Sequence, residues 1–209
     1  MMESNHSTAG VAVAMPPDLA APPVELERTL ALAANPTPEL RSWVERAKGA
    51  GIFTDLTDEQ LASVLAPGQL HHYRAGDTII QYGDASDSMF ALLREGRVRI
   101  VTPINLPPPV GDWLAGEKSL LELPAPQVVG HMNLLASTTR SATVEALTDL
   151  EAVEVQKAYL DALAQHDLRL GYLLMRNIAR SLQVQLRFTN ADVTNLTVAV
   201  ALAARALRK

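Results

Sequence analysis

The stretch VVGHMNLL at residues 128–135, followed after a short loop by RSATV at residues 140–144, decides how the rest of this sequence is interpreted. We expect a short turn of helix to start just after Gly130, and free backbone N–H groups at such a start point toward an anion. Arg140 returns to the same place ten residues later, on the next predicted strand. A guanidinium that faces a helix start is a good phosphate clamp, because fork geometry and charge assistance add to the amide donors. The pattern therefore predicts an anion site, and the plain alternative is a surface ion pair of Arg140.

The sequence around this stretch consists of short aliphatic and aromatic runs separated by turn signals. The runs are His71–Tyr73, Thr78–Gln81, Met89–Arg94, Val98–Thr102 and Ser119–Leu123. The turn signals are Ala75-Gly76-Asp77, Tyr82-Gly83-Asp84 and Glu95-Gly96. Short strands punctuated in this way predict a small antiparallel barrel or sandwich. A long hairpin loop is expected around Pro107-Pro108-Pro109, Gly111 and Gly116.

The N-terminal part of the chain is predicted to be disordered at first and helical afterwards. Residues 1–23 are rich in Ala, Pro, Ser and Asn and show no period, so we expect them to be disordered. A short helix is expected at Val24–Ala34, and Thr37-Pro38 is typical of the start of a second helix. The stretch Thr57-Asp58-Glu59-Gln60 is a capping box and predicts the start of a third helix.

The pattern is helical from Lys157 to residue 209, and one apolar stripe runs through it. Its members are Leu168, Tyr172, Met175, Ala179, Leu182, Leu186, Thr189, Val193, Leu196, Val200, Ala203 and Leu207. Their spacing alternates between four and three residues, which is a heptad register sustained over several turns. The stripe predicts a dimer seam, and the alternative is a helix that packs on its own barrel.

Composition limits the classes of function. The 209 residues are 48% apolar and carry a formal net charge of −5, which permits a sizeable core and argues against nucleic acid as the main partner. The absence of cysteine excludes disulfides and thiolate metal sites and suits a reducing cytoplasm. No apolar run approaches the roughly 20 residues that span a bilayer, and no secretory signal is expected.

Motifs for catalysis and for metal binding also fail. None of the five histidines forms a metal-like pair at helical spacing. Gly111 and Gly116 have the spacing of a phosphate-binding P-loop, but Glu117 separates Gly116 from Lys118. We therefore expect no catalytic residue, no metal and no enzymatic activity.

The stretch at residues 128–144 resembles the phosphate-binding cassette of the cyclic-nucleotide-binding domain superfamily, found in catabolite-activator-type regulators, kinase regulatory subunits and gated channels. The upstream runs GDTIIQYGD at residues 76–84 and DSMFALLREGRV at residues 87–98 are also similar to that family, and the similarity spans roughly residues 50–190. The resemblance implies an α+β fold, a β jelly roll flanked by N-terminal helices and a long C-terminal helix. The expected segments are a disordered 1–23, helices in 24–67, the β-roll with its cassette in 68–156, and C-terminal helices in 157–209.

The resemblance implies that the cassette binds a phosphorylated ligand, with cyclic AMP or cyclic GMP as possible ligands. The implied contact residues are Val129, Gly130, His131, Met132, Asn133, Leu134, Leu135, Arg140, Ser141, Ala142 and, on the long helix near Leu186, Gln185. His131 stands where the family has a glutamate that accepts a hydrogen bond from the ribose 2′-hydroxyl, and Asn133 replaces a small residue. A neutral imidazole accepts one such bond, whereas a protonated one only donates. Three outcomes stay open: weak binding of a cyclic nucleotide, binding of another phosphorylated ligand, or a vestigial pocket.

Two hypotheses about function follow, with a weaker third. The first is a regulatory sensor domain that binds a small phosphorylated ligand and signals to a partner protein, as a homodimer joined by its C-terminal helix. The second is a scaffold or protein-interaction module that keeps the fold without the ligand. The third is a regulator that reads DNA in an unusual way, although no helix-turn-helix pattern follows the long helix in this sequence. We therefore expect a stand-alone effector domain.

Overall fold

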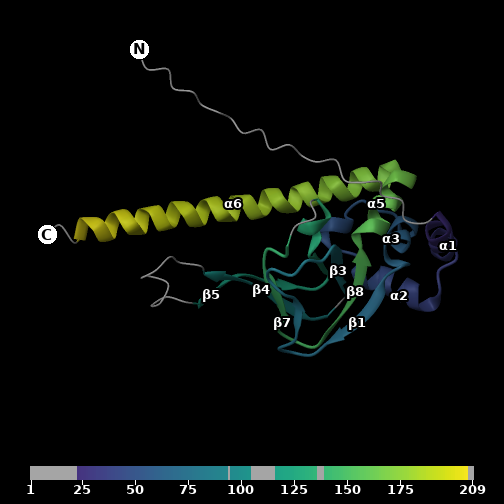
Figure 1. The fold of residues 1–209 in the computed structure, drawn as a ribbon, viewed down its shortest axis with the longest axis horizontal. Coiled ribbons are helices and arrows are strands. Elements are labelled where there is room, and N and C mark those ends of the chain that lie inside the picture. The colour runs from purple at the N-terminus through teal and green to yellow at the C-terminus, as the bar shows by residue number, and fades with distance from the viewer. Residues whose placement is uncertain (1–22, 94, 105–115, 136–138, 207–209) are drawn as a thin grey trace, which may run out of the picture.

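Two four-stranded antiparallel sheets form a roll, with helices at one end and a long helix passing over it, in a computed structural model that describes residues 23–93, 95–104, 116–135 and 139–206 (Figure 1). The strand order is β1-β8-β3-β6 in one sheet and β2-β7-β4-β5 in the other. The strands are β1 (Gln69–Tyr73), β2 (Thr78–Ile80), β3 (Ser88–Leu92), β4 (Arg97–Ile104), β5 (Gly116–Pro124), β6 (Gln127–Val129), β7 (Thr143–Ala146) and β8 (Leu150–Gln156). The predicted α+β jelly roll with N-terminal helices and a long C-terminal helix is confirmed.

Four short helical elements precede the roll: α1 (Pro23–Ala34), α2 (Pro38–Ala47), the 3-10 helix η1 (Gly51–Phe53) and α3 (Asp58–Leu65). The predicted helix starts are confirmed by side-chain caps. The Thr37 hydroxyl accepts from the Leu40 amide at 3.2 Å, and Thr57 and Gln60 make the reciprocal capping box. Each cap binds backbone N–H groups that have no partner inside the helix, so it defines where the chain becomes helical.

Strand β3 separates two apolar cores, and its five residues are all buried. Phe90 and Leu92 face the interior of the roll, where they join apolar residues of the opposite sheet such as Val98 and Val144. The alternate residues Met89 and Ala91 belong to the second core, between this sheet and the helices. Period-two alternation puts successive side chains on opposite faces, so a strand covered on both faces is largely apolar, and in β3 only the first residue, Ser88, is polar.

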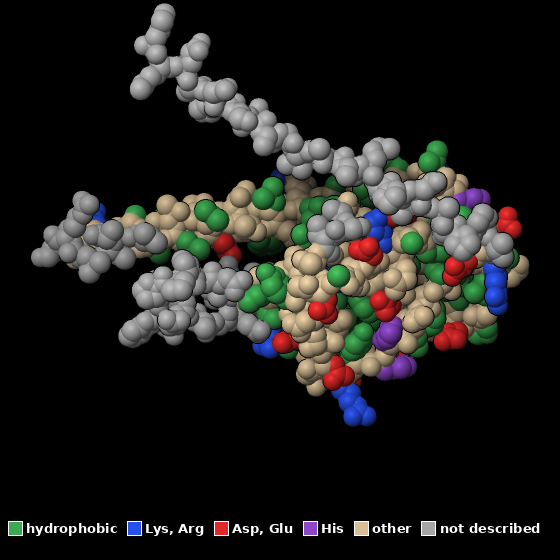
Figure 2. Space-filling view, in the orientation of Figure 1, with side chains coloured by type: hydrophobic (Ala, Val, Ile, Leu, Met, Phe, Trp, Pro, Cys, Tyr) green, Lys and Arg blue, Asp and Glu red, His purple; other side chains and the backbone are tan. Residues whose placement is uncertain are grey.

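The C-terminal part consists of α5 (Lys157–His166) and α6 (Leu168–Ala206), which has 39 residues and is therefore about 58 Å long. The first half of α6 buries Leu170, Leu174 and Ile178 in the core between the sheet and the helices. The second half extends past the sheets, and apolar side chains are visible along it (Figure 2). Of the predicted heptad stripe, Leu182 packs partly against the core, whereas Leu186 is 60% exposed.

The exposure of the stripe disagrees with the alternative prediction, in which these residues pack on the chain's own roll. Apart from Leu182, the described large apolar members are exposed: Leu168, Tyr172, Met175, Leu186, Val193 and Leu196. The barrel side of α6 carries other residues because an α-helix of 3.6 residues per turn presents different positions to each face. The dimer seam stays a prediction.

Two predictions concern segments outside the described residues: nearly all of the disordered 1–23 stretch, and the tip of the long hairpin loop at 105–115. None of the described helices has the length and apolar character required to cross a bilayer. Among the described residues, no group of three or more His, Cys, Asp or Glu is placed to hold a metal ion. The division into four segments stays a prediction.

Candidate ligand-binding cassette

The cassette follows β6 and begins at Gly130, which has φ of 77° and ψ of 1° in the left-handed region. A short 3-10 helix, η2 (His131–Leu134), starts directly after it, where a turn of helix was predicted. A Cβ atom at position 130 would lie 2.7 Å from Nη1 of Arg140 and 3.0 Å from Cδ1 of Ile80. Glycine is therefore required twice here, for its backbone conformation and for the approach of the guanidinium.

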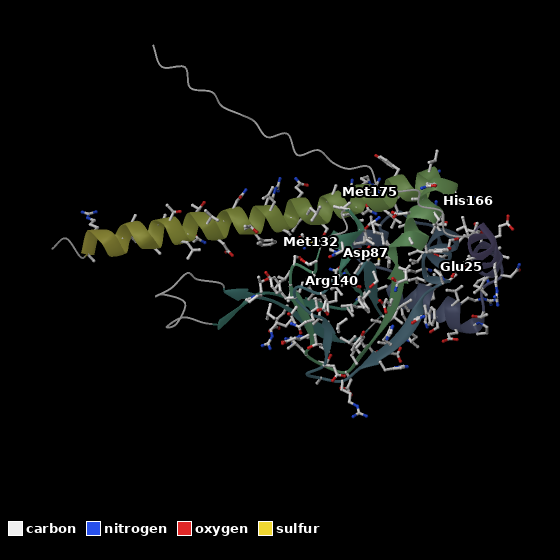
Figure 3. The ribbon with its side chains drawn as sticks, viewed as in Figure 1. Glu25, Asp87, Met132, Arg140, His166 and Met175 are labelled. Carbon is white, nitrogen blue, oxygen red and sulfur yellow. The ribbon has the colours of Figure 1, made fainter. Side chains whose placement is uncertain are left out.

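Arg140 lies directly behind this turn and is only 3% exposed. Its Nη1 donates to the carbonyl oxygens of Ser88 at 2.8 Å and of Gly130 at 3.2 Å. Its Nη2 donates to the hydroxyls of Ser86 and Ser88, each at 3.0 Å. Burial lowers the pKa of Arg140, and the negative charges of Glu154, Asp87 and Asp84 oppose this shift in that order. Figure 3 shows Arg140 and Asp87 in the part of the roll below α6.

The environment of Arg140 differs from the sequence expectation in two ways. Arg140 precedes β7 instead of lying on it, and its backbone is paired with the turn at residues 83–84. The Gly83 amide donates to the Arg140 carbonyl oxygen, and the Arg140 amide donates to the Asp84 carbonyl oxygen, both at 2.9 Å. Its guanidinium binds carbonyl and hydroxyl oxygens of the protein instead of being free beside the amides of η2. A buried guanidinium must satisfy its donors, and these oxygens are the acceptors within reach. A simple surface ion pair, the plain alternative, does not describe this side chain.

His131 is buried, with 7% of its surface exposed, between β6 and α6. Its Nδ1 lies 3.3 Å from the carbonyl oxygen of Val128, and its Nε2 lies 3.4 Å from the hydroxyl oxygen of Ser181 on α6. Burial lowers the pKa of His131, and the hydrogen bond to Val128 partly offsets this. A neutral imidazole therefore occupies the position at which the resemblance implied a glutamate.

The remaining predicted contact residues are distributed over the surface and the interior. Val129 lies in the interior of the roll, Asn133 is buried, and Leu134 packs against the core below the helices. Met132 and Leu135 are exposed, Ser141 donates to the Met132 sulfur at 3.6 Å, and Ala142 is half-buried. Gln185 is half-buried on α6, while its neighbour Leu186 is exposed. The structure thus brings Gly130 and Arg140 together and shows no bond from Gln185 to either.

Three serines of this site were not predicted. Ser86 and Ser88 bind the guanidinium of Arg140, and Ser181 binds His131. The spacing of Ser86 and Ser88 is a weak signal in the sequence, because residues two apart on a strand share a face. Ser181 has no such signal, since its role depends on where α6 crosses the roll.

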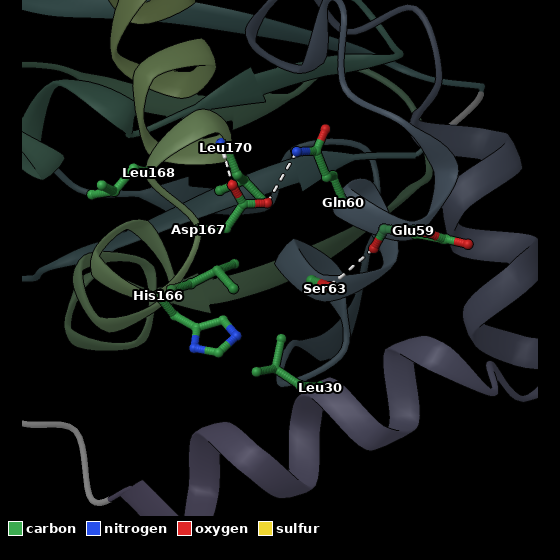
Figure 4. Close-up of a pocket in the computed structure, with 9 residues that line it drawn as sticks. Leu30, Glu59, Gln60, Ser63, His166, Asp167, Leu168 and Leu170 are labelled. Carbon is green, nitrogen blue, oxygen red and sulfur yellow. Dashed lines mark hydrogen bonds between the residues drawn. The ribbon is translucent and has the colours of Figure 1, made fainter.

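A hollow of about 560 Å³ lies away from the cassette, between α1, α3 and the α5–α6 junction (Figure 4). Its polar groups already serve the helix ends. Asp167 accepts from the Leu170 amide at 2.9 Å and from the Gln60 amide group at 3.0 Å. Ser63 donates to the backbone of Glu59 at 2.9 Å. The bond between Gln60 and Asp167 joins α3 to the start of α6, and none of these contacts indicates a ligand.

Comparisons with known proteins agree with the fold. Residues 70–167 match the family model described as cyclic nucleotide-binding domain. Glutaminase 1 of Bradyrhizobium diazoefficiens is 30% identical over 146 residues, which are 70% of this chain and 22% of that protein. The Thermus thermophilus Catabolite Activator Protein superposes with a TM-score of 0.58 and 24% identity, over 71% of this chain and 63% of that one. A cyclic nucleotide-binding domain from Methylobacillus flagellatus KT superposes with a TM-score of 0.60 and 17% identity, over 75% of this chain and 83% of that one.

The jelly roll, with a glycine turn and a buried arginine after β6, has the fold of cyclic nucleotide-binding domains. The match to the cyclic nucleotide-binding domain family covers residues 70–167, just under half of the chain, and the solved structures share its fold. The chain spans between 5% and 22% of the length of the curated relatives that it matches.

Proposed function

We propose that this domain is a regulatory sensor that binds a small phosphorylated ligand, a cyclic nucleotide or a related anion, at the cassette. The observation that carries this proposal is the convergence of the Arg140 guanidinium on Gly130, at the start of η2. The two carbonyl bonds of Nη1 hold the side chain aimed at the cassette. The two hydroxyl bonds of Nη2 are exchangeable, because Ser86 and Ser88 can rotate away while phosphate oxygens take their place.

The output of such a sensor would pass through α6 or the N-terminal helices to a partner protein. Asn177 of α6 donates to the carbonyl oxygens of Ile52 at 3.0 Å and Thr54 at 2.7 Å, so α6 is bonded to the segment around η1. The exposed stripe of α6 supports a homodimer. We propose that the domain is cytoplasmic, has no catalytic activity and binds neither a membrane nor nucleic acid.

A scaffold module that binds no ligand is the second candidate, and the burial of the cassette side chains favours it. Arg140 uses four of its five N–H donors within the protein, and the imidazole of His131 is held by Val128 and Ser181. Under the scaffold hypothesis, the arginine holds the cassette together and α6 provides the functional surface.

Calorimetric titration with cyclic AMP, cyclic GMP and a cyclic dinucleotide distinguishes the two candidates. A sensor releases or absorbs heat with at least one of them, and Arg140→Ala abolishes this while Arg140→Lys weakens it. Arg97→Ala is the matched control, because Arg97 is exposed on β4 and pairs with Glu122 away from the cassette. Circular dichroism shows whether each variant is folded. A folded wild-type protein that gives no heat and no thermal shift with any of the three ligands is instead a scaffold.

A further inference from the structure

His131 is the side chain that connects the cassette to α6. Its ring lies between the carbonyl oxygen of Val128 at the end of β6 and the hydroxyl of Ser181 on the helix. The two distances, 3.3 Å and 3.4 Å, are at the long end of hydrogen-bond geometry. No apolar substitute could make both contacts, so this ring adds a hydrogen-bonded link between η2 and α6 to the apolar packing of Leu134.

The two partners determine which nitrogen carries the proton in the neutral ring. The carbonyl oxygen of Val128 can only accept, so Nδ1 carries the hydrogen. Nε2 is then the lone-pair acceptor, and the hydroxyl of Ser181 donates to it. A second proton on Nε2 removes that acceptor and places a cation in a buried site.

The charged groups around this ring do not favour such a cation. Arg140 is a cation bonded to the carbonyl of Gly130, the residue next to His131. The acidic groups Asp84, Asp87 and Glu154, from the turn before β3 and from β8, act on the charge of Arg140. On α6, Arg180 beside Ser181 is exposed and is a cation. Among the groups named here, each acidic group serves Arg140 and none is hydrogen-bonded to the imidazole.

The position of Ser181 on α6 determines which part of the helix this contact holds. One helical turn earlier, the buried amide of Asn177 fixes the helix to the backbone of Ile52 and Thr54. One residue after Ser181, Leu182 is the last of the described α6 side chains that packs against the core below the helices. Ser181 therefore stands where α6 passes from its anchored half to its projecting half.

We propose that the His131–Ser181 contact is a proton-sensitive latch: the neutral imidazole holds the cassette against α6, and protonation releases η2 and the helix beyond Asn177. The latch acts on the apo domain and does not depend on a ligand, so it is independent of the proposed sensor function. It makes the docking of the cassette on α6 a function of pH.

The direction of the effect follows from proton linkage. The pKa of His131 is lowered from its ordinary 6.5 by burial in the docked state. The undocked ring is hydrated and keeps the ordinary pKa, so the undocked state binds the proton first as the pH falls. Docking is therefore complete above about pH 6.5. Between that pH and the lowered pKa, the equilibrium constant for docking falls by up to about tenfold per pH unit.

Hydrogen–deuterium exchange at about pH 7.5 and about pH 5.5, with intrinsic rates corrected for pH, tests the latch in the full chain. We expect protection of peptides covering residues 128–135 and 178–186 to fall at the lower pH, by up to about tenfold. Peptides around Ile52 and Asn177 should keep their protection, because the Asn177 amide group and the carbonyl oxygens of Ile52 and Thr54 do not titrate. His131→Gln should remove the pH dependence, and His166→Gln, an exposed position on α5, should retain it.

Titration of the wild-type imidazoles by NMR provides a test that does not need a variant. We expect the resonance of His131 to titrate below 6.5 and to move toward the ordinary value in Ser181→Ala. Two results would overturn the proposal. One is an ordinary pKa for His131, and the other is equal protection of residues 178–186 at both pH values, which would mean that the imidazolium stays docked by donating to Ser181.

Discussion

Arg140 donates from both of its terminal nitrogens to Ser88, a residue 52 positions earlier in the chain. Nη1 binds the carbonyl oxygen at 2.8 Å, and Nη2 binds the hydroxyl at 3.0 Å. Ser88 is completely buried at the start of β3. The contact joins the cassette to β3, an inner strand of the first sheet, and it makes the arginine a structural residue as well as a candidate ligand-binding one.

Arg140→Ala should therefore destabilise the fold in the absence of any ligand. The substitution leaves the buried carbonyl oxygens of Ser88 and Gly130 without these donors, and each such loss costs about 1–3 kcal/mol. We expect a decrease of about 2–4 kcal/mol in the free energy of unfolding, measured by urea denaturation. Arg97→Ala, at an exposed ion pair, should change it by less than about 0.5 kcal/mol. Equal small effects of both changes would contradict the structural role.

Gly130→Ala combines two kinds of strain. Position 130 has φ of 77°, and the added Cβ would lie 2.7 Å from Nη1 of Arg140. Gly76→Ala is the matched control, because Gly76 has φ of 95° but nothing within 4 Å of its would-be Cβ. The control should cost about 1–2 kcal/mol from backbone strain alone. Gly130→Ala should cost more than the control in the same urea experiment; an equal cost would mean that the guanidinium moves freely.

Leu186→Asp tests the predicted dimer seam of α6. Leu186 is exposed and lies on the heptad stripe, so a carboxylate there would be buried without a partner in a dimer. We expect the wild-type protein to have the mass of a dimer in light scattering and the variant that of a monomer. Thr194→Asp lies on another face of the same helix and should leave the dimer intact. A monomeric wild-type protein would exclude the seam.

Asn177→Ala should detach α6 from the segment around η1. The amide group of Asn177 satisfies the carbonyl oxygens of Ile52 and Thr54, and Asn177 itself is buried. We expect a loss of about 1–3 kcal/mol in the free energy of unfolding, together with faster amide exchange near residue 52. Asn190→Ala, at an exposed position of α6, should not destabilise the protein. If the two variants behave alike, the Asn177 contacts contribute nothing measurable.

Asp167 should make the stability depend on pH in the acid range. Its pKa is lowered from 3.8, first by the hydrogen bond from the Leu170 amide and then by that from Gln60. As the pH falls the unfolded chain binds the proton first, so the contribution is complete above the unfolded pKa and is lost as the pH falls through the folded pKa. Asp167→Asn should flatten the acid limb of urea midpoints plotted against pH. Glu27→Gln, at an exposed position, should keep the acid limb. If the urea midpoints of the wild type and both variants have the same slope against pH, the hydrogen bonds of Asp167 do not stabilise the fold.

The sequence predicted the fold and the principal cassette residues through local signals. The short strands between glycine turns indicated a small antiparallel barrel or sandwich, the family resemblance implied the jelly roll, and the Thr37 and Thr57 caps located two helix starts. The spacing of Gly130 and Arg140 indicated that they meet, and they do. These features could be predicted because turn conformations, caps and strand periodicity depend on residues that are close in the chain.

The sequence by itself determined the jelly roll, the helix starts and the pairing of glycine and arginine in the cassette. Only the tertiary structure decided the acceptors of the Arg140 guanidinium, the contact of His131 with Ser181, and the bonding of Asn177 to the turn around residues 52–54. These partners lie 52, 50 and 125 positions apart. Strand pairing and helix packing choose them, because a polar group removed from water must bond to whichever acceptor or donor the fold brings within reach.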